Sequence, residues 1–153
     1  MTNQVSFELE RQVARKPKAV FEVVSDISGW PQTIRSVQAV ELLTPWPPKK
    51  GTRFRVTRTL FGRTTTHDMK IADFEPPRRL RIVSSDPDLL YELDHIIDAV
   101  GGGSRFFMVF RSKPQAVAGK GLLPLMSPFL QSRLRDELEQ DMDDLVAAVR
   151  ALV

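Results

Sequence analysis

The feature that most constrains the fold is a long apolar stripe near the C-terminus. Its members recur at spacings of four, four, three, four and three positions, which is one face of an α-helix: Leu134, Leu138, Met142, Leu145, Val149 and Leu152. No other segment of the sequence offers an apolar helical face of this length. If the rest of the chain forms a sheet with one apolar face, this helix must therefore provide most of its cover.

The remainder of the chain is dominated by patterns typical of strands. Val5, Phe7 and Leu9 alternate with polar residues, as in a half-buried strand. Six further strands are expected at 36–44, 52–60, 63–74, 80–85, 89–100 and 104–112. Turn sequences rich in Pro or Gly separate them, among them PWPPKKG, EPPRR and GGG. Because there is no internal repeat or linker, we expect one α+β domain over residues 1–153.

Two short helices are expected between the first two strands, where the sequence reads VFEVVSDISGWPQTIRSV. Pro17 suits the first turn of one helix, and Asp26 or Ser28 is expected to cap the second. Trp30 and the adjoining Pro31 follow the break between them. We interpret Trp30 mainly as a packing anchor at this turn, with contact to a ligand as the alternative.

Composition excludes several classes of protein. The chain contains no cysteine, so it has no disulfide framework, cysteine nucleophile or thiolate metal site. The N-terminal sequence lacks the basic and apolar regions of a signal peptide. No apolar run reaches the roughly 18 residues that a membrane span requires. These features predict a cytoplasmic protein, and the compactness of the sequence favours a bacterial one.

The net charge of +3 is unevenly distributed along the chain. Residues 49–81 hold ten Lys and Arg against three acids, whereas residues 133–144 hold six acids against two arginines. A basic sheet can bind nucleic acid or an anionic membrane, but it can also simply be the solvated outer face of the fold. We favour the solvated face and expect no nucleic-acid partner. Transient membrane contact, and a monomeric or homodimeric state, stay open; the acidic helix face is a weaker candidate for protein interaction.

Several stretches together resemble a known family: VFEVVSDISGWP, GTRF, IADFEPPRRL and the amphipathic C-terminal helix. They are similar to the START-related (SRPBCC) superfamily, which includes polyketide cyclase/dehydrase-like proteins and the birch-pollen allergen family. The resemblance covers about Val5 to Leu152. It implies a helix-grip fold, in which a curved seven-stranded antiparallel sheet wraps around the long C-terminal helix. It also implies a cavity between sheet and helix that takes a hydrophobic small molecule.

The chain departs from the family pattern just after Trp30-Pro31. Many relatives continue with an aromatic residue and then Leu-Pro, whereas this chain has Gln32-Thr33-Ile34-Arg35. We expect Ile34 still to pack, so that the change alters one wall of the cavity entrance rather than the fold.

Strand alternation predicts which side chains face the expected cavity. The predicted ligand-binding residues on the strands are Phe54, Val56, Arg58, His67, Met69, Ile71, Ile82, Tyr91, Leu93, His95, Ile97, Phe106, Met108 and Phe110. Three more come from the LLPLMSPFL segment, which is either a gate or a kinked helix that fills the core: Met126, Phe129 and Leu130. A one-residue bulge in any of these strands would reverse the prediction for that strand.

Four polar residues share this apolar face: His67, His95, Tyr91 and Arg58. Polar groups that converge in an apolar pocket are typical of a small-molecule site, although each histidine can instead be a core residue satisfied by its neighbours. We therefore expect binding of a lipid-like or aromatic, polyketide-like molecule. The alternative is a cyclase or dehydratase in which a cavity histidine is the general base and Tyr91 or Arg58 stabilises an oxyanion. Whether turnover occurs is open.

No cofactor or metal is expected. In the strand order that the family resemblance implies, the two histidines lie on strands separated by one intervening strand, about 10 Å apart laterally, so they cannot readily share a zinc ion. Both could instead contact opposite ends of one planar ligand.

Overall fold

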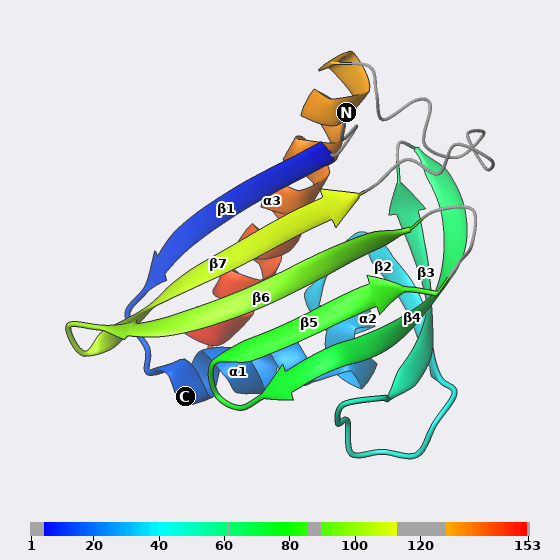
Figure 1. Cartoon of the computed structure of the whole chain (residues 1–153). Helices are drawn as coiled ribbons and strands as arrows, with labels where there is room; N and C mark the ends of the chain where they lie inside the picture. Colours follow the sequence, from blue (N-terminus) through cyan, green and yellow to red (C-terminus); the bar gives the residue numbers. More distant parts are fainter. Residues whose placement is uncertain (1–4, 61, 86–89, 113–127, 153) are drawn as a thin grey trace.

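The computed structural model describes residues 5–60, 62–85, 90–112 and 128–152. Within these ranges, seven strands form one antiparallel sheet in the order β1-β7-β6-β5-β4-β3-β2 (Figure 1). The strands are β1 (Val5–Val13), β2 (Val37–Leu42), β3 (Arg53–Leu60), β4 (Arg63–Glu75), β5 (Arg79–Ser84), β6 (Tyr91–Val100) and β7 (Gly103–Ser112). The helices are α1 (Pro17–Ser25), the 3₁₀ turn η1 (Ile27–Gly29), α2 (Trp30–Thr33) and α3 (Pro128–Arg150).

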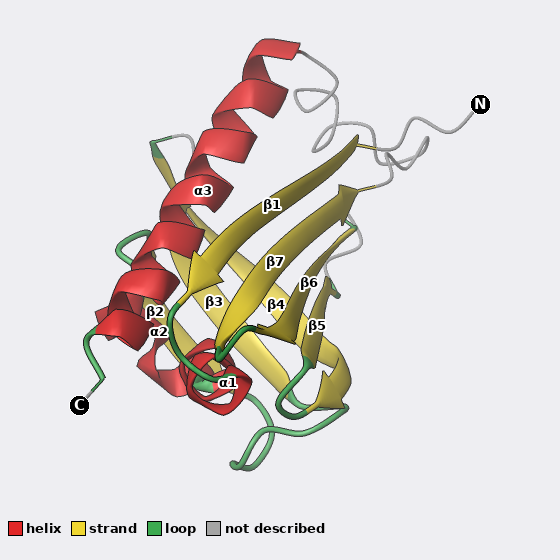
Figure 2. Cartoon of the chain, turned by 90° about the vertical axis from the view of Figure 1, so that its left-hand side faces the viewer, coloured by secondary structure: helices red, strands yellow, loops and turns green. Residues whose placement is uncertain are grey.

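The sheet curves, and α3 crosses it on one side while α1 and α2 lie at one end (Figure 2). Residues from all these elements form a single apolar cluster, so the inner face of the sheet and α3 share one core. The α+β helix-grip fold predicted from the sequence is therefore confirmed, including its seven strands and its two short helices after β1.

The apolar stripe of α3 supplies the helix side of the core. Its first five members are buried: Leu134, Leu138, Met142, Leu145 and Val149. Leu152 was predicted to continue the stripe, but it is 38% exposed. The reason is that α3 ends at Arg150, so Leu152 lies beyond the last helical turn.

The break after α1 is held by Trp30, as expected of a packing anchor. The indole is only 7% exposed, its N–H donates to the carbonyl of Val24 at 3.1 Å, and its ring packs edge-on against Phe54. Ile34 is also buried, so the departure from the family pattern leaves the packing intact. Pro17 occupies the first turn of α1 as predicted.

The predicted side-chain cap of α2 is wrong. Ser28 donates to the carboxylate of Asp26 at 3.3 Å, and neither side chain bonds to the first turn of a helix. The physical reason is that η1 intervenes, so that Gly29 becomes the residue preceding α2.

The outer face of the sheet carries a network of ion pairs. Arg55 binds Asp68 at 2.7 Å, Arg79 binds Asp94 at 2.7 Å, and Arg81 bridges to the neighbouring strands. These contacts neutralise part of the basic segment 49–81 by carboxylates of the sheet itself. They agree with the interpretation of that segment as a solvated face, except at the end of β3 and β4 that adjoins the loop between β2 and β3.

Candidate functional site

The inner face of the sheet is built as strand alternation requires. Nine of the predicted apolar residues are at most 6% exposed: Phe54, Val56, Met69, Ile71, Ile82, Ile97, Phe106, Met108 and Phe110. Tyr91 and Leu93 are partly buried against the same core. A bulge does occur in β4, between Ile71 and Asp73. The bulge follows the residues of β4 that strand alternation assigned to the inner face, so these residues still face inward.

Of the three residues predicted in the LLPLMSPFL segment, Phe129 does not join this face. Phe129 is 68% exposed, because it lies in the first turn of α3, where the helix extends past the sheet (Figure 2). Met126 and the side chain of Leu130 lie outside the described part of the structure.

Three of the four polar candidates gather near the start of β6 and the end of β3. The rings of His67 and Tyr91 meet edge to face, with centroids 6.3 Å apart. The Nε2 atom of His67 lies 3.1 Å from the hydroxyl of Thr65, which is the cross-strand partner of Arg58. The Tyr91 hydroxyl bonds to the sulfur of Met69 at 3.4 Å, and it is close enough to Arg58 to raise the pKa of that guanidinium electrostatically. We call Arg58, His67 and Tyr91 the polar cluster.

Tyr91 also connects the polar cluster to an aromatic wall. Its ring stacks on Phe110 at 5.5 Å, and Phe110 in turn stacks on Phe7 of β1 at 6.0 Å. Flat apolar surface and hydrogen-bonding groups thus lie side by side on the inner face. This is the combination that orients a ligand having an aromatic or aliphatic body and a polar end.

Arg58 is fixed by contacts to α3 and to the segment before β2. One of its terminal nitrogens donates to Asp141 of α3 and also to the hydroxyl of Ser36 at 2.9 Å. Ser36 donates in turn to Asp141 at 2.8 Å. Burial opposes the charge of Arg58, but Asp141 outweighs this effect and keeps the pKa of the guanidinium above its ordinary value. Arg58 is therefore a fixed cation.

The Nε atom of Arg58 is buried and has no hydrogen-bond partner within the described residues. A buried N–H without an acceptor is unfavourable by about 1–3 kcal/mol, so this group is available to an acceptor atom of a ligand or to water. Together with its position beside Tyr91, this donor makes the polar cluster a candidate ligand site.

His95 lies apart from the polar cluster. It is 2% exposed, its ring stacks on Phe106, and its Nδ1 atom lies 3.0 Å from the backbone oxygen of Leu80, its partner on β5. Burial lowers the pKa of His95 to about 4, so the ring is neutral near pH 7. These contacts are those of a core histidine satisfied by the backbone.

The two histidines are too far apart to hold one small ligand together. Leu80 pairs with His95 on one side and with Phe74 on the other, so Phe74 marks the level of His95 on β4. His67 is seven residues from Phe74 along that strand. At about 3.3 Å per residue the offset is roughly 20 Å, in addition to the lateral separation of two strand spacings. The expectation that both rings contact one planar ligand is therefore wrong. Strand alternation shows on which face of the sheet a residue lies, but it does not show how far along the strand direction two residues on different strands are separated.

Two residues that the sequence analysis did not predict belong to the site region. Asp141 and Asp144 are at most 9% exposed, although both belong to the acidic run 133–144, which the sequence analysis considered only as a face for protein interaction. A signal for Asp141 was present, since it follows Leu134 by seven positions and so falls on the apolar face of the helix. Asp144 bonds to the backbone N–H and the guanidinium of Arg35, which ties α3 to the segment after α2.

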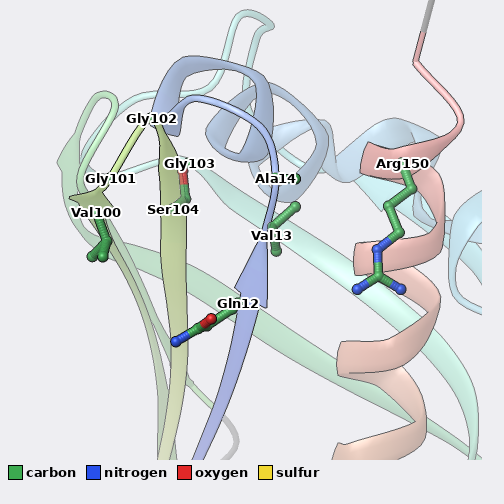
Figure 3. A pocket seen from close by; sticks show the side chains of 9 residues that line it. All are labelled: Gln12, Val13, Ala14, Val100, Gly101, Gly102, Gly103, Ser104 and Arg150. Carbon is green, nitrogen blue, oxygen red and sulfur yellow. The ribbon is translucent and has the colours of Figure 1, made fainter.

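A separate surface pocket of about 460 Å³ lies at the opposite end of β6 and β7 (Figure 3). It is lined by the end of β1, the Gly101–Gly103 hairpin turn and Arg150. It contains none of the residues predicted to bind a ligand. Tyr91 and Val100 are nine residues apart on β6, so this pocket is about 30 Å from the polar cluster.

These observations define the class of protein: a helix-grip domain whose inner face is mainly apolar and has a polar cluster at one end. The match to a family model is more specific. Residues 4–150 match the model described as "Polyketide cyclase / dehydrase and lipid transport", and the chain belongs to this family. The START-related resemblance inferred from the sequence is thereby confirmed. No curated protein matches the sequence.

Solved structures share the fold at low sequence identity. The Zhui aromatase/cyclase from Streptomyces sp. R1128 is similar with a TM-score of 0.82 and 16% identity, covering 97% of this chain and 94% of that chain. TTHA0849 from Thermus thermophilus has a TM-score of 0.79 and 18% identity, covering 95% and 97%. A START superfamily protein from Mycobacterium smegmatis has a TM-score of 0.75 and 15% identity, covering 98% and 99%. At these identities the similarity establishes the fold alone.

Proposed function

We propose that the protein binds a hydrophobic small molecule between the sheet and α3, with the molecule's polar end at Arg58, His67 and Tyr91. The observation that carries this proposal is the buried, unpartnered Nε of Arg58 beside an aromatic wall. The ligand class is a lipid-like or aromatic, polyketide-like molecule that has an acceptor oxygen at one end. Membership of a family of cyclases, dehydrases and lipid transporters supports this class.

A second candidate function is a cyclase or dehydratase. It is favoured by the edge-to-face contact of His67 with Tyr91, beside the fixed cation Arg58. In this reaction His67 takes a proton from the carbon next to a carbonyl group, and the carbonyl oxygen becomes an enolate that Arg58 and Tyr91 stabilise. The enolate then attacks a second carbonyl carbon to close a ring, and the resulting alkoxide takes the proton back from His67. Alternatively, the enolate expels a β-hydroxyl group, which takes the same proton from His67 and leaves as water.

The first test is native mass spectrometry of the protein purified from its own host, followed by extraction and identification of any bound compound. We expect a stoichiometric organic molecule. Its affinity should fall about fivefold in Tyr91→Phe, the loss of one hydrogen bond, and should be unchanged in the matched control His95→Gln. If no compound is bound and none from a host extract binds, the binding proposal is wrong.

The same compound separates the two candidate functions. Incubation with the wild type and with His67→Ala, followed by mass spectrometry, measures any product. Conversion by the wild type that is lost in His67→Ala supports an enzyme, whereas unchanged compound with intact binding supports a carrier.

A further inference from the structure

The loop that joins β2 to β3, residues 43–52, projects from the end of the sheet (Figure 1). It carries Trp46, which is 45% exposed. The other tryptophan, Trp30, is buried with its N–H satisfied, so the exposure of Trp46 is a property of this loop rather than of the residue type. A tryptophan held in water is characteristic of surfaces that contact the headgroup region of a membrane.

The loop is held in place by hydrogen bonds at both ends. At its start, the N–H of Leu43 donates to the carbonyl of Arg53 at 2.9 Å. At its end, the N–H of Gly51 donates to Ile71 of β4, and the N–H of Lys49 donates to the hydroxyl of Thr52, both at 2.9 Å. The loop therefore presents its exposed side chain from an ordered base.

Four exposed cations surround the base of this loop: Lys49, Lys50, Arg53 and Lys70. We call them the basic rim. None of them forms an ion pair with another residue of the described ranges, unlike Arg55, Arg79 and Arg81 on the same sheet. The nearest acids on the outer face, Glu41 and Asp68, are both engaged by Arg55.

Two members of the basic rim directly oppose each other. Arg53 and Lys70 are cross-strand partners of β3 and β4. Like charges in this position repel each other, so the pairing of these two side chains does not stabilise the sheet. Both charges are available to an anion at the base of the loop that carries Trp46.

We propose that the Trp46 loop and the basic rim form a contact surface for an anionic lipid bilayer. The cations are complementary to the negative headgroups, and Trp46 inserts its ring at the level of the headgroups. This surface is distinct from the polar cluster: Arg53 and Arg58 are five residues apart on β3, about 17 Å. The inference therefore does not depend on the identity of the ligand.

The test is sedimentation of the full chain with vesicles of phosphatidylcholine containing one quarter phosphatidylserine, compared with pure phosphatidylcholine. We expect binding only to the anionic vesicles, and loss of binding as salt is added. Lys49→Gln/Lys50→Gln should lower the partition coefficient roughly thirtyfold. Arg63→Gln/Arg150→Gln removes the same charge from two exposed sites elsewhere and should change it far less.

Tryptophan fluorescence gives a second readout, because the chain has only two tryptophans. Anionic vesicles should shift the emission of the wild type to shorter wavelength and protect it from a soluble quencher. Trp46→Ala should abolish both effects, since Trp30 is already buried. Equal loss of partition in the two double variants, or a Trp46 signal that vesicles leave unchanged, overturns the proposal. Binding to a single-stranded oligonucleotide without binding to vesicles also overturns it.

Discussion

The buried neutral state of His95 predicts a specific dependence of stability on pH. The ring is enclosed by Phe106 and the β5 backbone, and burial lowers its pKa from 6.5 to about 4. The unfolded chain therefore binds a proton at this site at a higher pH than the folded chain does. The stabilisation that the neutral His95 ring contributes is fully present above about pH 6.5 and is lost as the pH falls toward 4.

The expected magnitude follows from the two pKa values. Acidification from pH 7 to pH 5 should lower the free energy of unfolding by about 2 kcal/mol through His95 alone. This window lies above the pH at which ordinary carboxylates are protonated, so their contribution is small.

The assay is urea denaturation at pH 7 and pH 5 of the wild type, His95→Gln and His67→Gln. Glutamine keeps a donor for the Leu80 carbonyl but does not titrate. The loss between the two pH values should disappear in His95→Gln and persist in His67→Gln, and the chain has no third histidine. If His95→Gln retains the full loss, the neutral core histidine is not its source and the reasoning is refuted.

Two further predictions concern the connection of α3 to the sheet. Asp141→Asn leaves Arg58 without its carboxylate and should lower the free energy of unfolding by about 3 kcal/mol, measured by urea denaturation. Arg35→Gln should have a much smaller effect in the same assay, because that side chain is 71% exposed; equal effects would contradict the difference in burial. Met142→Ala removes a fully buried side chain from the apolar stripe and should lower the free energy of unfolding by about 2–5 kcal/mol, and a value near zero would mean that α3 does not close the core.

The fold could be predicted because its determinants are periodic. A period of two along each strand and a period near 3.6 along α3 determine which side chains are buried, and these patterns are local. Trp30 was predictable as an anchor because the turn sequence around it requires one large packed residue. The 3₁₀ turn η1 was missed because three residues are too few to show a period.

The candidate site was only partly predictable, because it depends on register. Alternation placed Arg58, His67, Tyr91 and His95 on one face, but only the pairing of the strands shows that His95 lies at another level. Asp141 was missed because its charge was given more weight than its position on the helix. Its charge is compatible with burial because Arg58 and Ser36, both remote in sequence, donate hydrogen bonds to it.

The inner face thus divides into two ends with different chemistry. At one end His95, Phe106 and Leu80 form a buried core in which His95 has a hydrogen-bond partner, and substitution there should change stability and its dependence on pH. At the other end Arg58 retains an unsatisfied donor beside Tyr91, where a conservative substitution such as Tyr91→Phe should change ligand affinity more than stability. Because Arg58 is bonded to Asp141, the polar end also fastens α3 to the sheet. A ligand that accepts a hydrogen bond from the Nε atom of Arg58 would contact the residue that joins β3 to α3. Because such a ligand binds the folded state only, its binding should raise the free energy of unfolding of the whole domain by mass action.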